Sequence, residues 1–88
     1  FYASTKAAQR VLAESIAREF GPQGIHVSYF VIDAAIDNPR TRPGMFPRKP
    51  DNFFIKPEAI AAEIYHVVMQ DKSAWSFNIE LRPFGEVW

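Results

Sequence analysis

Apolar residues recur at every fourth position near the start of the chain, a spacing that places them on one face of an α-helix. The row consists of Ala8, Leu12, Ile16 and Phe20. Charged residues lie off this row, and frequent alanines favour the helical state. After the row, Gly21 suits the left-handed position that ends many helices, and Pro22 cannot continue one. The pattern therefore predicts a helix over residues 2–20.

A run of β-branched and aromatic residues follows at 25–32 and has the length of a strand. It is apolar without interruption from Tyr29 to Ile32, which is typical of a strand covered on both faces. A short turn is all that separates it from the predicted helix. A helix followed so closely by such a strand is expected to be one half of a βαβ unit.

Residues 33–56 form a long irregular segment. Prolines at positions 39, 43, 47 and 50 exclude a long helix or a central strand, and such a length favours a functional loop. A solvated loop is the favoured interpretation of its basic residues, and contact with a cofactor phosphate or an anionic substrate is the alternative. These residues are Arg40, Arg42, Arg48 and Lys49. The segment also contains large apolar side chains, which we expect to cover another part of the molecule. They belong to Met45, Phe46, Phe53 and Phe54.

Pro57 opens a second helical pattern that continues to about Gln70, because Pro is favoured in the first turn of a helix. Its expected buried stripe consists of Ile60, Ile64, Val67 and Val68. Residues 75–82 then alternate between apolar and polar, which predicts a half-exposed strand. The apolar positions are Trp75, Phe77, Ile79 and Leu81. The order of helix, strand, loop, helix and strand predicts an α/β fold.

Composition narrows the function classes. Hydrophobic residues make up 48% of the chain and charged residues 23%, which excludes a disordered chain. The net charge is zero, so nothing suggests a nucleic-acid partner. Cysteine is absent, and no apolar run approaches the roughly 20 residues that span a bilayer. We therefore expect a cytoplasmic protein without a membrane partner, a disulfide framework or a thiolate metal site.

The chain begins at Phe1, at the head of a helical pattern with no capping residue before it. We expect a segment of a larger protein. The alternatives are an internal start, a truncated product, or earlier residues that this sequence does not include. A chain of 88 residues is also short enough that a free-standing core would be marginal.

Candidate chemistry lies in the first helix. Tyr2 and Lys6 are four residues apart, so a helix places them on one face. The neighbouring ammonium and the helix N-terminus would both favour the phenolate of Tyr2. A phenol tuned in this way can exchange a proton with an alcohol or carbonyl oxygen. The alternative is a packed ring beside a solvated amine, which is the commoner meaning of this spacing.

The sequence around the pair extends the pattern. It reads Tyr2-Ala3-Ser4-Thr5-Lys6-Ala7-Ala8, and after the helix come Gly21-Pro22-Gln23-Gly24-Ile25-His26-Val27. This resembles the active-site helix and following strand of the short-chain dehydrogenase/reductase family. There the pattern is Tyr, three residues, Lys, a small-residue helix, a glycine-containing turn and Ile-Arg-Val. Residues 56–61 resemble the family's penultimate helix, and the final alternating strand resembles its last sheet strand.

The resemblance implies a Rossmann fold, with a doubly wound parallel sheet of which residues 1–88 are the C-terminal part. It further implies a nicotinamide cofactor, NAD or NADP, and hydride transfer at an alcohol or carbonyl carbon. Tyr2 would be the general acid/base. Lys6 would hold the nicotinamide ribose and lower the pKa of Tyr2, so both residues would also contact the cofactor.

Other parts of the family pattern are absent or altered. The glycine-rich phosphate loop and the catalytic Ser and Asn would precede Phe1, so we expect the 88-residue piece to be inactive alone. Ile32 and Asp33 occupy the family's Pro-Gly position, and Asp37 or Asn38 replaces its Thr. Cofactor contacts carried over to this segment are those of Asp33, Asp37 and the backbone of Ala35 or Ile36.

Two rival interpretations remain. One is a catalytically inactive relative that acts as an interaction or regulatory subunit, which the altered Pro-Gly position favours. The other is a structural module that shares only the helix pattern. The resemblance also predicts a homo-dimer or homo-tetramer assembled through helix 2–20 and strand 75–82. For His26 and His66 we expect surface or packing roles, since neither has a partner at metal-ligand spacing.

Overall fold

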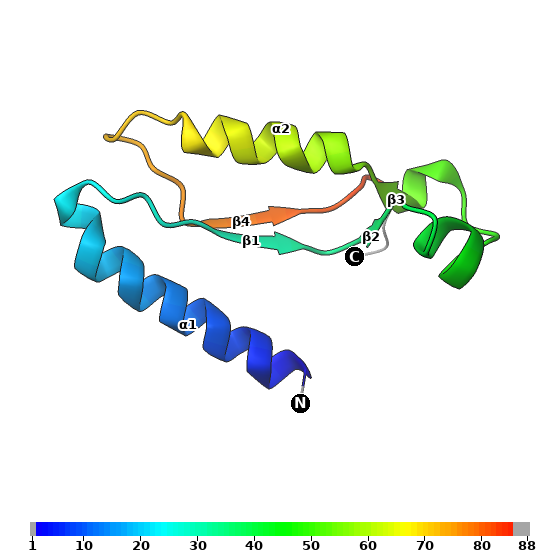
Figure 1. The fold of residues 1–88 in the computed structure, drawn as a ribbon, viewed down its shortest axis with the longest axis horizontal. Coiled ribbons are helices and arrows are strands. Elements are labelled where there is room, and N and C mark those ends of the chain that lie inside the picture. Colours follow the sequence, from blue (N-terminus) through cyan, green and yellow to red (C-terminus); the bar gives the residue numbers. More distant parts are fainter. Residues whose placement is uncertain (1, 86–88) are drawn as a thin grey trace.

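The computed structural model describes residues 2–85, except for the side chain of Tyr2. Two helices flank a pair of parallel strands (Figure 1). Helix α1 lies beside strand β1, and helix α2 lies beside strand β4. The elements in chain order are α1 (Tyr2–Phe20), β1 (Tyr29–Ile32), β2 (Ala35–Ile36), β3 (Phe54–Ile55), α2 (Pro57–Val68) and β4 (Asn78–Leu81).

Helix α1 has the bounds that its apolar period predicts. A 3₁₀ turn over Gly21–Gln23 follows it, and Gly24 then adopts the left-handed conformation, with φ of 88°. The expectation that Gly21 takes this position was therefore wrong. The 3₁₀ turn moves the left-handed residue three positions along the chain, because the amide of Gly24 donates to the carbonyl of Gly21.

Strands β1 and β4 pair in parallel, with Tyr29 opposite Asn78 and Ile32 opposite Leu81. Helix α2 lies in the connection between them, so β1, α2 and β4 form a βαβ arrangement. The unit expected from helix 2–20 and the strand after it is a different one and stays a prediction. Both strands are shorter than predicted from 25–32 and 75–82. Side chains instead bridge the flanking segments: the Ser28 hydroxyl donates to the carbonyl of Ser76 over 2.8 Å. The alternation expected for the last strand is confirmed in β4, where Ile79 and Leu81 are half-buried and Asn78 and Glu80 are exposed.

The segment expected to be irregular contains a second parallel pair, β2 with β3. A π-type turn over Thr41–Met45 and a 3₁₀ turn over Asp51–Phe53 lie between these two short strands. Phe54 is buried in β3, and its ring meets those of Phe46 and Phe53 edge-on. The predicted covering role therefore holds for these phenylalanines, whereas Met45 is exposed.

Helix α2 ends at Val68, two residues earlier than the pattern suggested. Ile60 and Val67 are buried, together with Phe54 and Ile55 of β3. Ile64 and Val68 are exposed, so the stripe that the helix buries in this chain is narrower than predicted. On α1 the apolar residues Val11 and Leu12 are also exposed.

The described residues form an α/β arrangement with small parallel sheets, as the sequence predicted. The molecule is elongated, with a radius of gyration of 15.5 Å, whereas about 12 Å is typical for a compact domain of this length. Within residues 2–85, no helix is long and apolar enough to cross a membrane.

Candidate functional site

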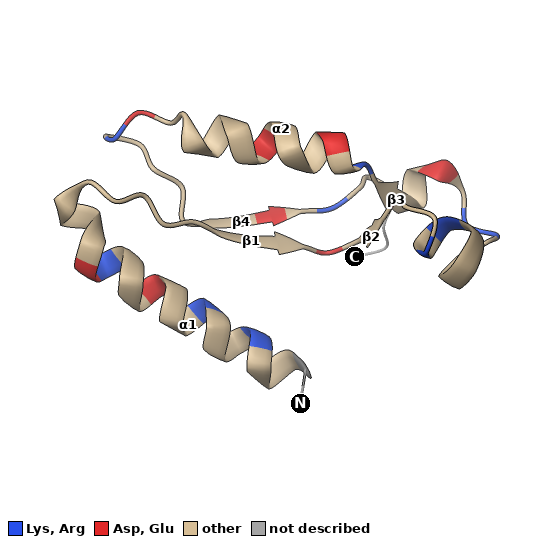
Figure 2. Cartoon of the chain, viewed as in Figure 1, with Lys and Arg blue, Asp and Glu red and all other residues tan. Residues whose placement is uncertain are grey.

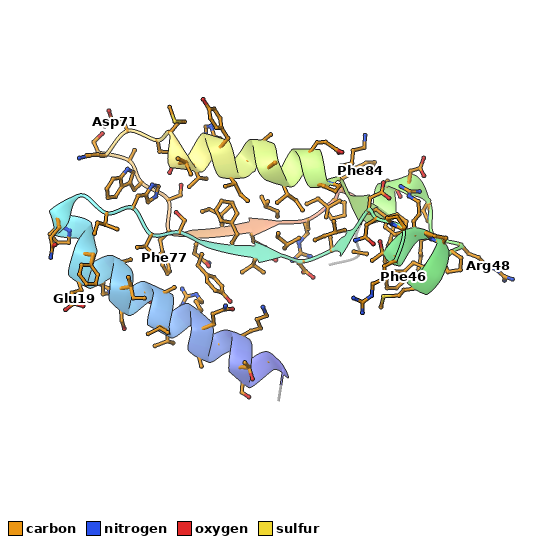
Figure 3. The ribbon with its side chains drawn as sticks, viewed as in Figure 1. Glu19, Phe46, Arg48, Asp71, Phe77 and Phe84 are labelled. Carbon is orange, nitrogen blue, oxygen red and sulfur yellow. The ribbon has the colours of Figure 1, made fainter. Side chains whose placement is uncertain are left out.

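Helix α1 runs opposite to β1, so its amino end lies on the side toward which the carboxyl end of β1 points (Figure 1). The hydroxyl of Tyr29 donates to the carbonyl of Lys6 over 3.2 Å and ties the first turns of α1 to β1. Further along the helix, the Arg10 guanidinium lies 5.9 Å from the ring centroid of Phe77, which comes just before β4. Figure 3 shows Phe77 between the strands and α1. These contacts fix the direction of the helix against the strand pair.

The two catalytic candidates lie on the first turns of α1. The backbone of Tyr2 opens the helix, and its side chain lies outside the described residues. Lys6 follows one turn later and is exposed. The helix therefore has the bounds that bring positions 2 and 6 to one face.

Asp33 follows β1, and its amide donates to the carbonyl of Leu81, which extends the ladder by one bond. Its carboxylate lies 2.8 Å from the guanidinium of Arg82. Arg82 also pairs with Glu80 and is largely covered. No pattern in the sequence explained an acid in place of the family's Pro-Gly. In the structure, Arg82, just after β4, pairs with that acid and shares its charge between Asp33 and Glu80.

Ala35 and Ile36 form β2 and pair with Phe54 and Ile55. The hydroxyl of Thr41 donates to the carbonyl of Ile36. The backbone proposed to meet the nicotinamide is thus held in a strand rather than in an irregular loop. Sequence reasoning missed this role of Thr41, because the hydroxyl acts across the turn that separates the two residues.

The Asp37 carboxylate forms a two-point ion pair with Arg42, with N–O distances of 2.8 and 3.0 Å. Arg42 also reaches Asp51 over 2.5 Å, and its guanidinium lies 4.4 Å from the ring centroid of Phe54. The hydrogen bond from Arg42 lowers the pKa of Asp37 below its ordinary value. Asp37 is therefore an anion whose oxygens are engaged by the loop itself.

Asn38 shapes the turn that follows. Its side-chain oxygen accepts hydrogen bonds from the amides of Arg40 and Thr41 over 2.9 and 3.0 Å. This arrangement is common for Asn at the start of a turn. Asn38 thus has a structural reason to stand where the family has Thr, and the same contacts fix the backbone of Arg40.

Three of the four cofactor residues carried over to the segment after β1 line one open groove, of about 570 Å³, beyond the carboxyl end of that strand. Asp33, Ala35 and Ile36 line it together, and Phe46 and Phe53 contribute from the loop. The remaining residue of that set, Asp37, lines a neighbouring groove of about 710 Å³ beside Arg42 and the start of α2. Lys6, whose carbonyl contacts the hydroxyl of Tyr29 at the start of β1, does not line either groove.

Charge is concentrated in the loop between β2 and β3, where Figure 2 shows several Lys and Arg residues. These cations differ in their surroundings. Arg42 is engaged by two carboxylates, and Lys49 lies 5.1 Å from the ring centroid of Phe53. Arg40 lines the groove next to β1. The solvated-loop interpretation therefore describes only part of the cluster.

His26 packs at the opposite end of the strands. Its ring stacks on that of Trp75 at 4.5 Å, and Nε2 lies 3.0 Å from the carbonyl of Ser76. A carbonyl can only accept, so this nitrogen carries the proton and cannot serve as a base toward Ser28. The expected packing role agrees with this geometry. Among the residues that the structure describes, no group of three His, Cys, Asp or Glu side chains could hold a metal ion.

No protein family, no curated protein and no solved structure gives a significant match to this chain.

Proposed function

We propose that this chain is the C-terminal part of a nicotinamide-dependent oxidoreductase of the short-chain dehydrogenase/reductase type, built on a Rossmann sheet. One observation carries the proposal: α1 runs opposite to the parallel strands, so its first turns, with Tyr2 and Lys6, form the end of the helix toward which the carboxyl ends of β1 and β4 point. Ligands of open parallel α/β sheets bind outside the carboxyl ends of the strands. The groove of about 570 Å³ opens at this end.

The chemistry assigned to the first helix is a proton exchange. In the reductive direction, Tyr2 donates its phenolic proton to the carbonyl oxygen of the substrate; in the oxidative direction, the phenolate takes the proton from the alcohol. A positive charge at Lys6 would favour the phenolate form of Tyr2. A bound nicotinamide would supply or accept the hydride at the carbon atom.

The residues present are compatible with a nicotinamide nucleotide at this edge. The ammonium of Lys6 offers three donors for ribose hydroxyls. Ala35 and Ile36 present a fixed backbone along the groove. Arg82, which is shared with Glu80, offsets part of the charge of Asp33. The choice between NAD and NADP rests on residues outside this sequence.

A second candidate function is an inactive relative that serves as an interaction or regulatory subunit. The observation that favours it is the engagement of Asp37 by Arg42. In the family pattern a Thr hydroxyl occupies this position. Both oxygens of Asp37 are engaged by a guanidinium, so Asp37 is a poorer replacement for that hydroxyl than a free side chain would be. Under this candidate, α1 keeps its packing surface while turnover is lost.

Exposed apolar side chains on α1 support assembly of the complete protein into a homo-dimer or homo-tetramer. Val11 is 60% exposed in this chain and Leu12 is 62% exposed. Burial of such side chains against a second copy would remove apolar surface from water. We further propose that the substrate is a small-molecule alcohol or carbonyl compound and that the protein is cytoplasmic.

Lys6 gives a test that separates the two candidates. In the full-length protein, Lys6→Ala should weaken both cofactor affinity and turnover, and Lys6→Arg should restore them only in part, because a guanidinium is planar and differently shaped. The measurements are nicotinamide absorbance at steady state and a cofactor titration, with Lys72→Ala as an exposed control outside the site. Unchanged affinity and turnover in Lys6→Ala would contradict the proposed role. Cofactor binding without turnover in the unmodified protein would favour the inactive relative.

A further inference from the structure

The groove at the carboxyl end of β1 has mainly apolar walls. Ile32, Ile36 and Ala34 form the side toward the strands, and Met45, Phe46 and Phe53 form the side toward the loop. The Phe46 and Phe53 rings lie 5.1 Å apart, so the loop side is an aromatic surface. A groove of this kind takes an apolar or aromatic body, and its few polar groups determine which way round that body binds.

Two charged side chains line this groove, those of Asp33 and Arg40. The Arg82 guanidinium pairs with the Asp33 carboxylate over 2.8 Å and also with Glu80, so Asp33 has an ion-pair partner that offsets part of its charge. Arg40 makes no ion pair with any described residue, in contrast to Arg42, which is held by Asp37 and Asp51. The cation of Arg40 is therefore the charge along this groove that the described part of the chain leaves uncompensated.

The backbone of Arg40 is fixed on both sides. Its amide donates to the side chain of Asn38 over 2.9 Å, and its carbonyl accepts from the amide of Met45 over 3.1 Å. A cation on a fixed backbone needs less ordering when it binds a ligand, which raises affinity. Arg48 of the same loop provides a contrast, since Figure 3 shows it directed outward at the far tip of the loop.

We infer that this groove selects carbonyl or alcohol substrates that carry an apolar or aromatic body and an anionic group, with Arg40 as the residue that binds the anion. Guanidinium groups bind carboxylates by two parallel hydrogen bonds. The inference rests on the proposed function for the identity of the reacting group. The binding preference itself depends only on the groove and on Arg40.

The test compares two ketones of the same aromatic body in the full-length protein. 4-Acetylbenzoate carries a carboxylate, and acetophenone does not. Binding is measured by ligand-observed NMR titration, and turnover by nicotinamide absorbance. We expect 4-acetylbenzoate to bind roughly tenfold more tightly, because a hydrogen bond to a charged group contributes at least this much. Arg40→Gln should remove the difference, and Arg48→Gln should leave it unchanged.

The outcomes separate the inference from the proposed function. Equal binding of the two ketones, or a preference that survives in Arg40→Gln, would overturn the inference whether or not nicotinamide is consumed. Equal loss of the preference in Arg48→Gln would also overturn it, because a general effect of positive charge would then explain the result. A carboxylate preference that depends on Arg40 but occurs without nicotinamide turnover would support the inference and contradict the proposed oxidoreductase.

Discussion

The residue-level feature with the clearest consequence is the ion network of Asp37, Arg42 and Asp51. Arg42 joins the end of β2 to the turn before β3 and lies over the Phe54 ring. The pKa of Asp37 is lowered from its ordinary value of 3.8, chiefly by the hydrogen bond from Arg42. Stability linked to a lowered pKa is present above the ordinary pKa and is lost as the pH falls through the folded-state pKa.

We therefore expect Arg42→Gln to lower the unfolding midpoint of the full-length protein at neutral pH. The difference from the unmodified protein should begin to shrink as the pH falls below about 4, where the unfolded chain takes up a proton at Asp37, and should vanish below the lowered folded-state pKa, where Asp37 is neutral in both proteins. Thermal unfolding followed across this pH range is the measurement, and Arg48→Gln is the matched control. A difference that stays constant down to the lowest pH would show that the ion pair with Asp37 is not its source.

Gly85 is a second residue with a specific steric role. A Cβ atom at this position would lie 2.4 Å from the backbone oxygen of Asn52. Because a backbone atom cannot give way as a side chain can, we expect Gly85→Ala to cost about 1–3 kcal/mol of unfolding free energy. A Cβ atom on Gly44 would meet nothing within 4 Å, so Gly44→Ala should be neutral or slightly stabilising. Urea unfolding of the full-length protein with each variant tests the close contact between Gly85 and Asn52. Equal changes in unfolding free energy would refute it.

At the scale of elements, neighbouring valines on α2 test the observed orientation of the helix. Val67 is 3% exposed and Val68 is 65% exposed. Val67→Ala should cost about 1.5–3 kcal/mol of unfolding free energy, from lost burial and the cavity left behind. Val68→Ala should stay within about 0.5 kcal/mol. Chemical denaturation compares the two variants. An equal loss of unfolding free energy would mean that Val68 is covered as well as Val67, as the apolar stripe predicted from the sequence requires.

The helices were predictable because each carries its own period, and the first also has a stop signal at Gly21 and Pro22, whereas the second has only a start signal at Pro57. The bounds of α1 matched, and α2 ended two residues early. The strands were predicted too long, since their ends depend on which partner backbone is within reach. The β2–β3 pair was not predicted, because two-residue strands show no period. The sequence also showed which acids follow β1 but not their partners, since Arg82 reaches Asp33 only once β1 and β4 are paired.

At the scale of the whole molecule, the chain has little core. The buried apolar residues that the structure describes are Phe54, Ile55, Ile60 and Val67. We expect the isolated 88-residue chain to be poorly folded, because this burial is small against the conformational entropy of ordering the chain. Thermal unfolding followed by near-UV circular dichroism is the measurement. A cooperative transition with a native-like signal would show that these residues form a self-sufficient domain.

Proton transfer by Tyr2 is tested most directly by Tyr2→Phe in the full-length protein, which keeps the ring and removes the hydroxyl. Steady-state nicotinamide absorbance and a cofactor titration are measured beside Tyr65→Phe, a control at an exposed tyrosine of α2. We expect turnover to fall by roughly 10²–10⁴-fold in Tyr2→Phe, with cofactor affinity little changed, and no change in Tyr65→Phe. Full turnover in Tyr2→Phe would contradict the assignment of Tyr2 as the general acid/base.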